Sequence, residues 1–129
     1  IQKMQEGYDM VIVSRYYNGA KSEDDTLMTH FGNRLFTKLI NVFFDSHYTD
    51  TLVMFRAWKK EIAKNLERRP TIAGLEPQLA IECAKKKLKV TEISGDEPRR
   101  ISGSRKTNPF PAAFAILALI AQEFFTRDR

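Results

Sequence analysis

The segment YDMVIVSRYY, residues 8–17, contains an uninterrupted β-branched run from Val11 to Val13. Such a run predicts a strand that is buried on both faces of a sheet. Ser14 and Arg15 follow at the point where this strand ends. Because ligands of open α/β sheets bind outside the carboxyl ends of the strands, a guanidinium at this point is a candidate for anion binding. The plain alternative is a core strand followed by a solvated arginine.

Apolar periodicity around this strand predicts a helix-rich α/β chain. Residues 27–44 repeat apolar side chains at three- and four-residue steps, which indicates an amphipathic helix. A second helix is expected over about 57–66, since Pro70 prevents its continuation. A third opens at residues 74–77, and a short strand is expected over 88–93. Residues 1–7 resemble the last turn of a helix with Gly7 as its C-cap and lack an initiator Met, which suggests a fragment.

The last apolar segment, residues 110–125, is hydrophobic on all sides as far as Ala121. It is too short to span a membrane, and the sequence has no run of 18 or more apolar residues and no signal peptide. A buried core helix, an oligomer contact and an interfacial anchor remain open. The basic residues on both sides favour contact with anionic lipid. We expect self-association through this helix and a cytoplasmic location, at the inner face of the membrane.

The composition points to one globular domain with an anionic ligand. The chain has 129 residues and a net charge of +5. No aromatic residues interleave with its basic clusters, so phosphate is favoured over nucleic acid. Cys83 is the single cysteine, and it and the two histidines, His30 and His47, lack metal-ligand spacing. We expect all three to be structural or surface residues.

The segment SGDEPRRISGSRKTN, residues 94–108, is rich in glycine, serine and basic residues. Flexible backbone N–H groups, hydroxyls and cations make a good phosphate cradle or lid. The glycine and lysine spacing is not that of a P-loop. A solvated basic linker is the alternative.

Four strings lie in one order between Gly7 and Lys106: GYDMVIVSRYYNG, FGNRLFTKL, DTLVMFRAWKKE and KVTEISGDEPRRISGSRK. Together they resemble the second half of glycosyltransferase family 2 proteins, especially bacterial enzymes similar to dolichyl-phosphate mannose synthase. The resemblance covers most of the chain. It implies a partial Rossmann-like α/β fold of the GT-A type, helix-rich and with few strands. Residues 1–108 would then be the acceptor-side part of a glycosyltransferase domain, and 109–129 an apolar C-terminal helix.

The resemblance also implies a reaction and residue roles. The reaction is inverting transfer of a sugar from a nucleotide-diphosphate donor, often to a polyprenyl phosphate. Ser14 and Arg15 match a pair that helps to bind the acceptor phosphate, and Asp50 matches the acidic residue near the reacting centre, the best candidate for a general base. Arg56 matches the arginine of a Gly-Phe-Arg-Ala string. The matches to a mobile loop that closes over substrate phosphates are Arg100, Gly103, Arg105 and Lys106.

These residue types suit the chemistry. A carboxylate can take a proton from a hydroxyl acceptor, whereas a phosphate acceptor needs cations to position it and no base. Arginines near a leaving diphosphate would stabilise the charge that builds in the transition state. On its own, however, an aspartate in a loop such as Asp50 is usually a cap or turn residue.

Two departures from the family pattern limit these expectations. Met54 stands where the glycine of the Gly-Phe-Arg-Ala string would be. The nucleotide-binding half and its Asp-x-Asp metal motif are absent, and no Asp-x-Asp occurs in the 129 residues. We therefore expect a divalent metal, Mg or Mn, in the full-length protein, none bound by this chain alone, and no activity from the chain alone.

Two hypotheses from other classes remain beside the glycosyltransferase. One is a non-catalytic basic module that binds anionic lipid or another phosphate-bearing partner through residues 99–106. The other is a purely structural fragment that folds around the 27–44 helix and associates with itself. The donor sugar, its nucleotide, the acceptor and the linkage are not readable from these residues.

Overall fold

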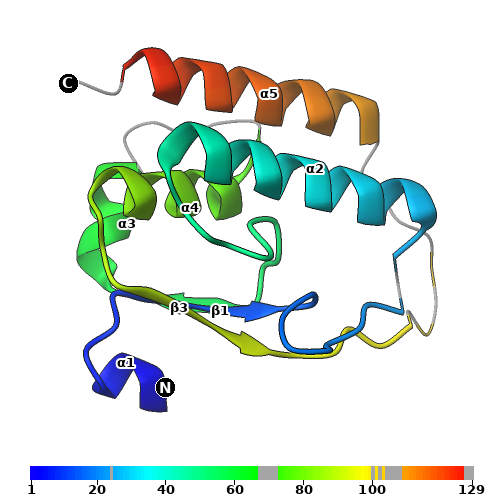
Figure 1. Cartoon of the computed structure of the whole chain (residues 1–129), viewed down its shortest axis with the longest axis horizontal. Coiled ribbons are helices and arrows are strands. Elements are labelled where there is room, and N and C mark those ends of the chain that lie inside the picture. Colours follow the sequence, from blue (N-terminus) through cyan, green and yellow to red (C-terminus); the bar gives the residue numbers. More distant parts are fainter. Residues whose placement is uncertain (24, 67–72, 100, 102, 104–108, 127–129) are drawn as a thin grey trace.

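The computed structural model describes residues 1–129 except 24, 67–72, 100, 102, 104–108 and 127–129. Its elements follow the order α1 (Gln2–Gln5), β1 (Met10–Ser14), α2 (Leu27–Phe44), β2 (Arg56–Trp58), α3 (Lys60–Leu66), α4 (Leu75–Lys85), β3 (Val90–Ser94) and α5 (Pro109–Phe125) (Figure 1). The fold is mixed α/β, consistent with part of a Rossmann-like fold as the sequence predicted.

The sheet has three strands in the order β2-β1-β3, so the predicted strand is its centre. β3 runs parallel to β1, with Met10 opposite Val90 and Ser14 opposite Ser94. β2 pairs antiparallel with β1, with Met10 opposite Trp58. The parallel pairing places the carboxyl ends of β1 and β3 at the same edge, where the loops that follow Ser14 and Ser94 meet.

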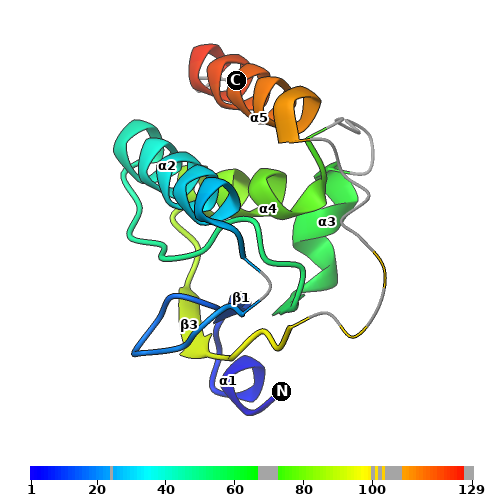
Figure 2. The same cartoon turned by 90° about the vertical axis from the view of Figure 1, so that its right-hand side faces the viewer.

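The helices α2 to α5 form two layers on one side of the sheet, and the short α1 lies on the other side (Figure 1). Figure 1 and Figure 2 show α2, α3 and α4 over the sheet and α5 outside them, alongside α2. The core is shared by the layers: Met10 and Ile12 of β1, Ile40 of α2 and Ile120 of α5 belong to one buried cluster. Apolar side chains of α2, α3, α4 and α5 therefore meet in this core, as amphipathic segments require.

Most predicted elements are confirmed, with one correction. The helices expected over 27–44, from 74 onward and over 110–125, and the strand expected over 88–93, are present as α2, α4, α5 and β3. The helix expected from Ala57 is wrong at its start, because Arg56–Trp58 is a strand and the helix begins at Lys60. Three residues are too few for strand periodicity to show in the sequence, and pairing with β1 overrides the apparent helical spacing.

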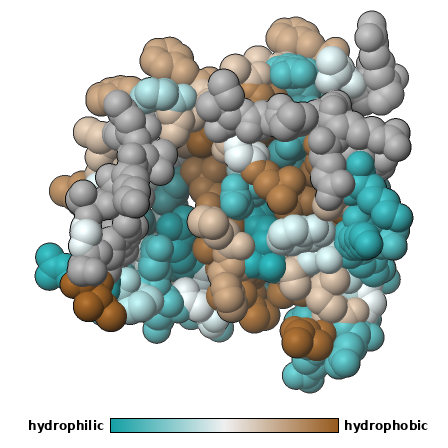
Figure 3. Space-filling model, turned by 180° about the vertical axis from the view of Figure 1, so that it is seen from behind, coloured by the Kyte–Doolittle hydropathy of each residue, from teal (hydrophilic) through white to brown (hydrophobic). Residues whose placement is uncertain are grey.

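α5 buries one face and leaves the other exposed. Ile116, Leu119 and Ile120 are at most 6% exposed, whereas Phe114 is 74% exposed. Seen from behind, apolar side chains also project along the upper rim of the molecule, where α5 lies (Figure 3). Self-association through this face stays a prediction. Among the described residues, no helix combines the length and the hydrophobicity that crossing a bilayer would take.

Cys83 is a buried structural thiol, as the sequence indicated. It is fully buried in α4, and burial raises its pKa to about 12, so it is protonated at neutral pH. His30 lies at the surface of α2, with half of its side chain exposed.

Candidate functional site

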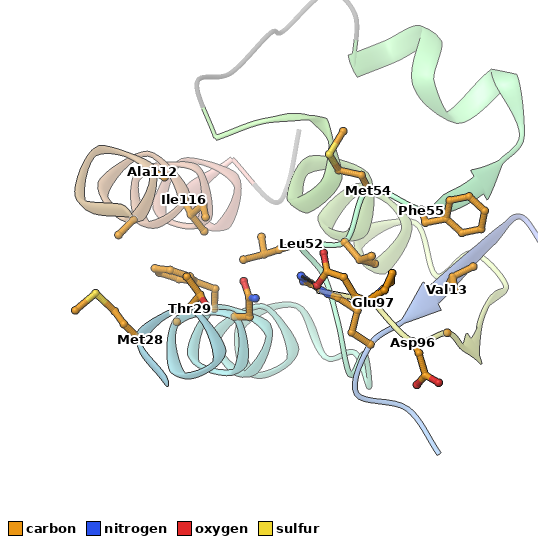
Figure 4. A pocket seen from close by; sticks show the side chains of 18 of the residues that line it. Val13, Met28, Thr29, Leu52, Met54, Phe55, Asp96, Glu97, Ala112 and Ile116 are labelled. Atoms are coloured by element: carbon orange, nitrogen blue, oxygen red, sulfur yellow. Dashed lines mark hydrogen bonds and ion pairs between the residues drawn. The ribbon is translucent and has the colours of Figure 1, made fainter. Parts of the chain in front are cut away.

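A cavity of about 930 Å³ opens at the carboxyl ends of β1 and β3, between the N-terminal halves of α2 and α5. This is the edge where the sequence predicted ligand binding. One wall is apolar and comes from α2, the 52–55 loop and α5, with Met28, Leu52 and Ile116 among its side chains (Figure 4). The other end is polar and holds Arg15, Asn33 and Glu97. The cavity is thus suited to a ligand with a polar head and a hydrocarbon body.

Arg15 and Asp50 form a buried ion pair at the polar end. Arg15 Nε donates to Asp50 Oδ2 at 2.8 Å, and Nη2 donates to Oδ1 at 3.1 Å, a two-point contact. Asp50 is fully buried and Arg15 is 8% exposed. Burial alone would lower the pKa of Arg15, but the hydrogen bonds and charge of Asp50 raise it well above its usual value, so the guanidinium stays charged.

Asp50 also caps the loop that follows it. Its Oδ1 accepts hydrogen bonds from the backbone N–H groups of Leu52 and Val53, at 3.3 and 3.1 Å. Its Oδ2 accepts another from the backbone of Arg15, at 3.2 Å. The turn role that the sequence allowed is therefore present together with the ion pair, and both carboxylate oxygens are occupied by N–H donors. Its role as a general base stays a prediction.

Two further carboxylates face Arg15. Nη1 donates to Glu97 Oε2 at 3.3 Å and lies 3.9 Å from Asp25 Oδ1. Glu97 points into the cavity, whereas the carboxylate of Asp96 points away from it (Figure 4). With Asp50, three carboxylates surround one guanidinium. An incoming anion would therefore have to displace one of them before it could bind Arg15.

The backbone around Glu97 is fixed by neighbouring loops. Its N–H donates to the Lys21 carbonyl at 2.9 Å, and its carbonyl accepts from the N–H of Glu23 at 2.8 Å. Ser22 Oγ donates to the Glu97 carboxylate. Just before it, Gly95 lies so close to β1 that an added Cβ would be 2.2 Å from Val13 Cγ1. The backbone of Glu97 is thus held in place by its neighbours, whereas a third of its side chain remains exposed.

An aromatic cluster flanks the other side of Arg15. The guanidinium carbon lies 5.4 Å from the ring centre of Tyr16, which packs edge-on against His30. Tyr16 Oη donates to Asp25 and accepts from Asn33 Nδ2 at 3.0 Å. Burial raises the pKa of Tyr16, so the phenol is neutral near pH 7. The cluster links the loop after β1 to the first turns of α2.

Ser14 belongs to a buried hydrogen-bond network. Its Oγ lies 2.5 Å from Thr49 Oγ1, which donates to Glu92 Oε2 at 2.9 Å. Glu92 Oε1 accepts the backbone N–H groups of Thr49 and Asp50, at 2.8 and 3.3 Å. Burial raises the pKa of Glu92, although these hydrogen bonds oppose the shift. Ser14 itself is fully buried, and this network fixes the segment that carries Asp50.

Arg56 contacts backbone carbonyls. Its Nη1 donates to the Glu76 carbonyl at 2.9 Å, its Nη2 to the Thr51 carbonyl at 3.0 Å and its Nε to the Val53 carbonyl at 2.9 Å. It is not among the residues that line the cavity. Burial lowers its pKa from the usual value. These contacts clamp the 51–53 loop to the start of α4, and a contact of Arg56 with substrate stays a prediction.

The remaining sequence candidates are only partly covered. Arg100, Arg105 and Lys106 lie outside the described residues, whereas Gly103 is described and has a φ of +85°, which favours glycine. Within the described ranges, no group of three or more His, Cys, Asp or Glu side chains is arranged to hold a metal ion. The carboxylates near Arg15 instead surround a guanidinium, so they do not fit a divalent cation, and the expected metal stays a prediction for the full-length protein.

Sequence reasoning missed Glu97, Asp25 and Asn33. Glu97 follows β3 by three residues, and the rule that predicted a site after β1 applies equally to the parallel neighbour. The glycines, serines and basic residues of the segment after β3 predict a phosphate cradle, and that pattern gives no role to its acidic part, Asp96 and Glu97. Asp25 and Asn33 gave no local sign of their contacts.

No protein-family model matches the chain. Among curated proteins, it is similar to "Glycosyltransferase AglJ" of Haloferax volcanii, with 27% identity over 104 residues. The alignment covers 81% of this chain and 34% of the relative, so the chain spans about a third of that protein's length. This distant similarity supports a role in glycosyl transfer in general terms.

Proposed function

We propose that this chain is the acceptor-side part of an inverting family 2 glycosyltransferase of the GT-A type, whose acceptor is a polyprenyl phosphate. The observation that carries the proposal is the amphipathic cavity at the carboxyl ends of β1 and β3. Its size lies within the usual range of roughly 300–1,000 Å³ for small-molecule sites. The distant similarity to a glycosyltransferase agrees with this assignment.

The cavity matches the two halves of such an acceptor. The apolar wall, which includes Phe36, Leu52 and Ile116, suits the isoprenoid units nearest to the phosphate. Arg15 at the polar end would bind the phosphate through Nη1, the nitrogen that now faces Glu97. A phosphate oxygen would displace the more exposed carboxylate, Glu97, while buried Asp50 keeps the guanidinium oriented.

In this scheme Asp50 positions Arg15. A phosphate acceptor is already ionised and needs no general base. The proposal therefore does not require a free oxygen on Asp50, whose two carboxylate oxygens both accept hydrogen bonds from N–H groups. The acceptor oxygen would displace the nucleoside diphosphate in line, which inverts the sugar carbon. Arg100, Arg105 and Lys106 would contribute charge near the phosphates, as the family resemblance implies.

The donor would be held mainly by residues beyond this chain. We expect the isolated chain to neither bind nor hydrolyse uridine or guanosine diphosphate sugars at micromolar concentrations with manganese. Calorimetry with both sugar classes measures this. Micromolar binding would show that the donor site lies within these residues, against the proposal.

The acceptor assignment is tested with farnesyl phosphate as a short probe. We expect it to bind the chain more tightly than farnesol or inorganic phosphate, because it uses both ends of the cavity. Glu97→Gln should raise its affinity about two- to fivefold, the usual worth of one partly exposed ion pair. Glu61→Gln on α3, the same change at an exposed site, should leave it unaltered.

Equal affinity for farnesyl phosphate and farnesol would overturn the phosphate role of Arg15. Unchanged farnesyl phosphate affinity in Glu97→Gln would show that Glu97 does not compete with the ligand. The proposed location at a membrane surface rests on the exposed apolar face of α5 and is measured by flotation with vesicles.

A further inference from the structure

A second cleft, of about 440 Å³, lies on a different face of α2. It is lined by Phe31, Arg34, Leu35, Thr37, Lys38 and Asn41 of α2 and by Tyr48 and Thr49. It shares no lining residue with the large cavity. At 100° per residue, the α2 residues of the two sites fall on opposite sides of the helix. A ligand could therefore occupy one site without entering the other.

The cleft carries two cations and no carboxylate among its lining residues. Arg34 and Lys38 are one helical turn apart on the exposed side of α2. Within the part of the chain that the structure describes, neither forms a hydrogen bond or an ion pair with another side chain. Like charges at this spacing repel each other and cost helix stability. A bound anion would remove that repulsion.

The floor of the cleft is rigid. Asn41 Nδ2 donates to the Tyr48 carbonyl at 2.8 Å, and its Oδ1 accepts from the backbone of Tyr48 at 2.9 Å. Thr37 Oγ1 accepts the N–H of Thr51 at 3.1 Å. These groups are bonded to one another, so the wall keeps its shape while the two cations stay available. The acid bonded to this wall is Glu92, whose carboxylate accepts three hydrogen bonds, two from Thr49 and one from Asp50.

The two cavities differ in whether carboxylates already pair with their cationic side chains. Arg15 is surrounded by three carboxylates, so anion binding there begins with a displacement. Arg34 and Lys38 face no such competition within their cleft. Phe31 and Leu35 stand beside them with 67% and 39% exposure, which adds an apolar border. A phosphate group attached to an apolar body would satisfy both.

We propose that the Arg34–Lys38 cleft is a second anion site, which takes a phosphate group from an anionic lipid headgroup or from a free phosphate compound. This site does not depend on the function proposed above, since it uses none of the same residues. The two sources share one chemistry, and they are separated by experiment.

The test compares the wild-type chain with Arg34→Gln/Lys38→Gln. The control is Lys60→Gln/Lys64→Gln, which removes the same charge from two exposed lysines one turn apart on α3. The probes are pyrophosphate, followed by NMR shifts, and vesicles of phosphatidylglycerol or phosphatidylcholine, followed by co-sedimentation. Circular dichroism checks that each variant keeps its helices.

We expect the cleft variant to lose about thirtyfold in affinity for phosphatidylglycerol vesicles, the factor that two basic side chains contribute at an anionic surface. The control should lose much less. Pyrophosphate shifts centred on Arg34 and Lys38 without a vesicle difference would assign the site to free phosphate compounds, and the reverse would assign it to lipid. Equal losses of the two double variants with both probes, or binding of neither probe, would overturn the site.

Discussion

The Arg15–Asp50 pair gives the sharpest test of how this fold is stabilised. Asp50→Asn keeps the shape of the side chain but removes its charge and turns an N–H₂ group toward existing donors. The native carboxylate is fully buried and accepts five hydrogen bonds, two from the Arg15 guanidinium and three from backbone N–H groups. An amide oxygen can replace only part of this set.

The expected loss is about 3–5 kcal/mol in the free energy of unfolding, because the substitution breaks the buried two-point contact and leaves Arg15 with only the more distant carboxylates of Glu97 and Asp25. That is a large part of the roughly 5–15 kcal/mol that holds a domain folded. With a urea slope of about 1–3 kcal/mol per molar, the unfolding midpoint should fall by about 1–5 M. The measurement is urea denaturation of both chains, followed by circular dichroism.

Asp9→Asn is the matched control. Asp9 pairs with Lys59 at 2.7 Å, but the two side chains are 20% and 46% exposed. Such a surface pair is worth about 0–1 kcal/mol, and it weakens in salt. If Asp50→Asn costs no more than Asp9→Asn, the pair does not stabilise the fold as its burial suggests. If the large loss is found, low turnover of Asp50→Asn in a longer protein must be corrected for unfolding before Asp50 is called a base.

Two further predictions concern Glu92 and α5. Burial raises the folded-state pKa of Glu92 above its usual value of 4.5, so the ionised side chain at pH 7 destabilises the fold. The wild type should therefore gain stability relative to Glu92→Gln as the pH falls through that pKa toward 4.5, and at pH 7 it should be no more stable than the variant. Urea midpoints of both chains at both pH values measure this, and parallel pH profiles of the two chains would refute it. Leu117 of α5 is 44% exposed, so Leu117→Glu should abolish the self-association that light scattering measures. Ile120 is only 4% exposed, so Ile120→Glu should unfold the chain. A wild-type chain that is monomeric and binds no anionic vesicles would refute the role of α5.

The sequence predicted the elements whose cause is local or periodic. The β-branched run at Val11 to Val13 forms the central strand, and the apolar repeat over 27–44 coincides with α2. α2 is also capped locally, by the Thr26 side chain accepting from Thr29 N–H. The strand at Arg56–Trp58 was not predicted, because it forms by pairing with the edge of β1. β1 is more than 40 residues away in the sequence, so the residues around Arg56 give no sign of this pairing.

The sequence predicted the location of the candidate site better than the contacts within it. The carboxyl-edge rule needs only a strand and the residues directly after it, so Arg15 could be found from residues 8–17 alone. Its partners could not, since Asp50 is 35 residues away and Glu97 is 82. The family resemblance implied that Asp50 is a reacting group, which stays a prediction, and the structure shows contacts through which Asp50 positions Arg15.

The number of unused N–H donors separates the arginines of this chain more clearly than their place in a motif. The guanidinium of Arg56 donates hydrogen bonds to the carbonyls of Thr51, Val53 and Glu76. These bonds hold a loop against a helix and leave few N–H donors for a ligand. Arg15 keeps one nitrogen, Nη1, whose partner Glu97 is partly exposed and can be displaced. Arg34 lies in the FGNRLFTKL string, for which the family resemblance implied no role, yet no carboxylate lines the cleft that holds its charge. A motif specifies a residue type, whereas the capacity to bind phosphate depends on which donors folding has already used.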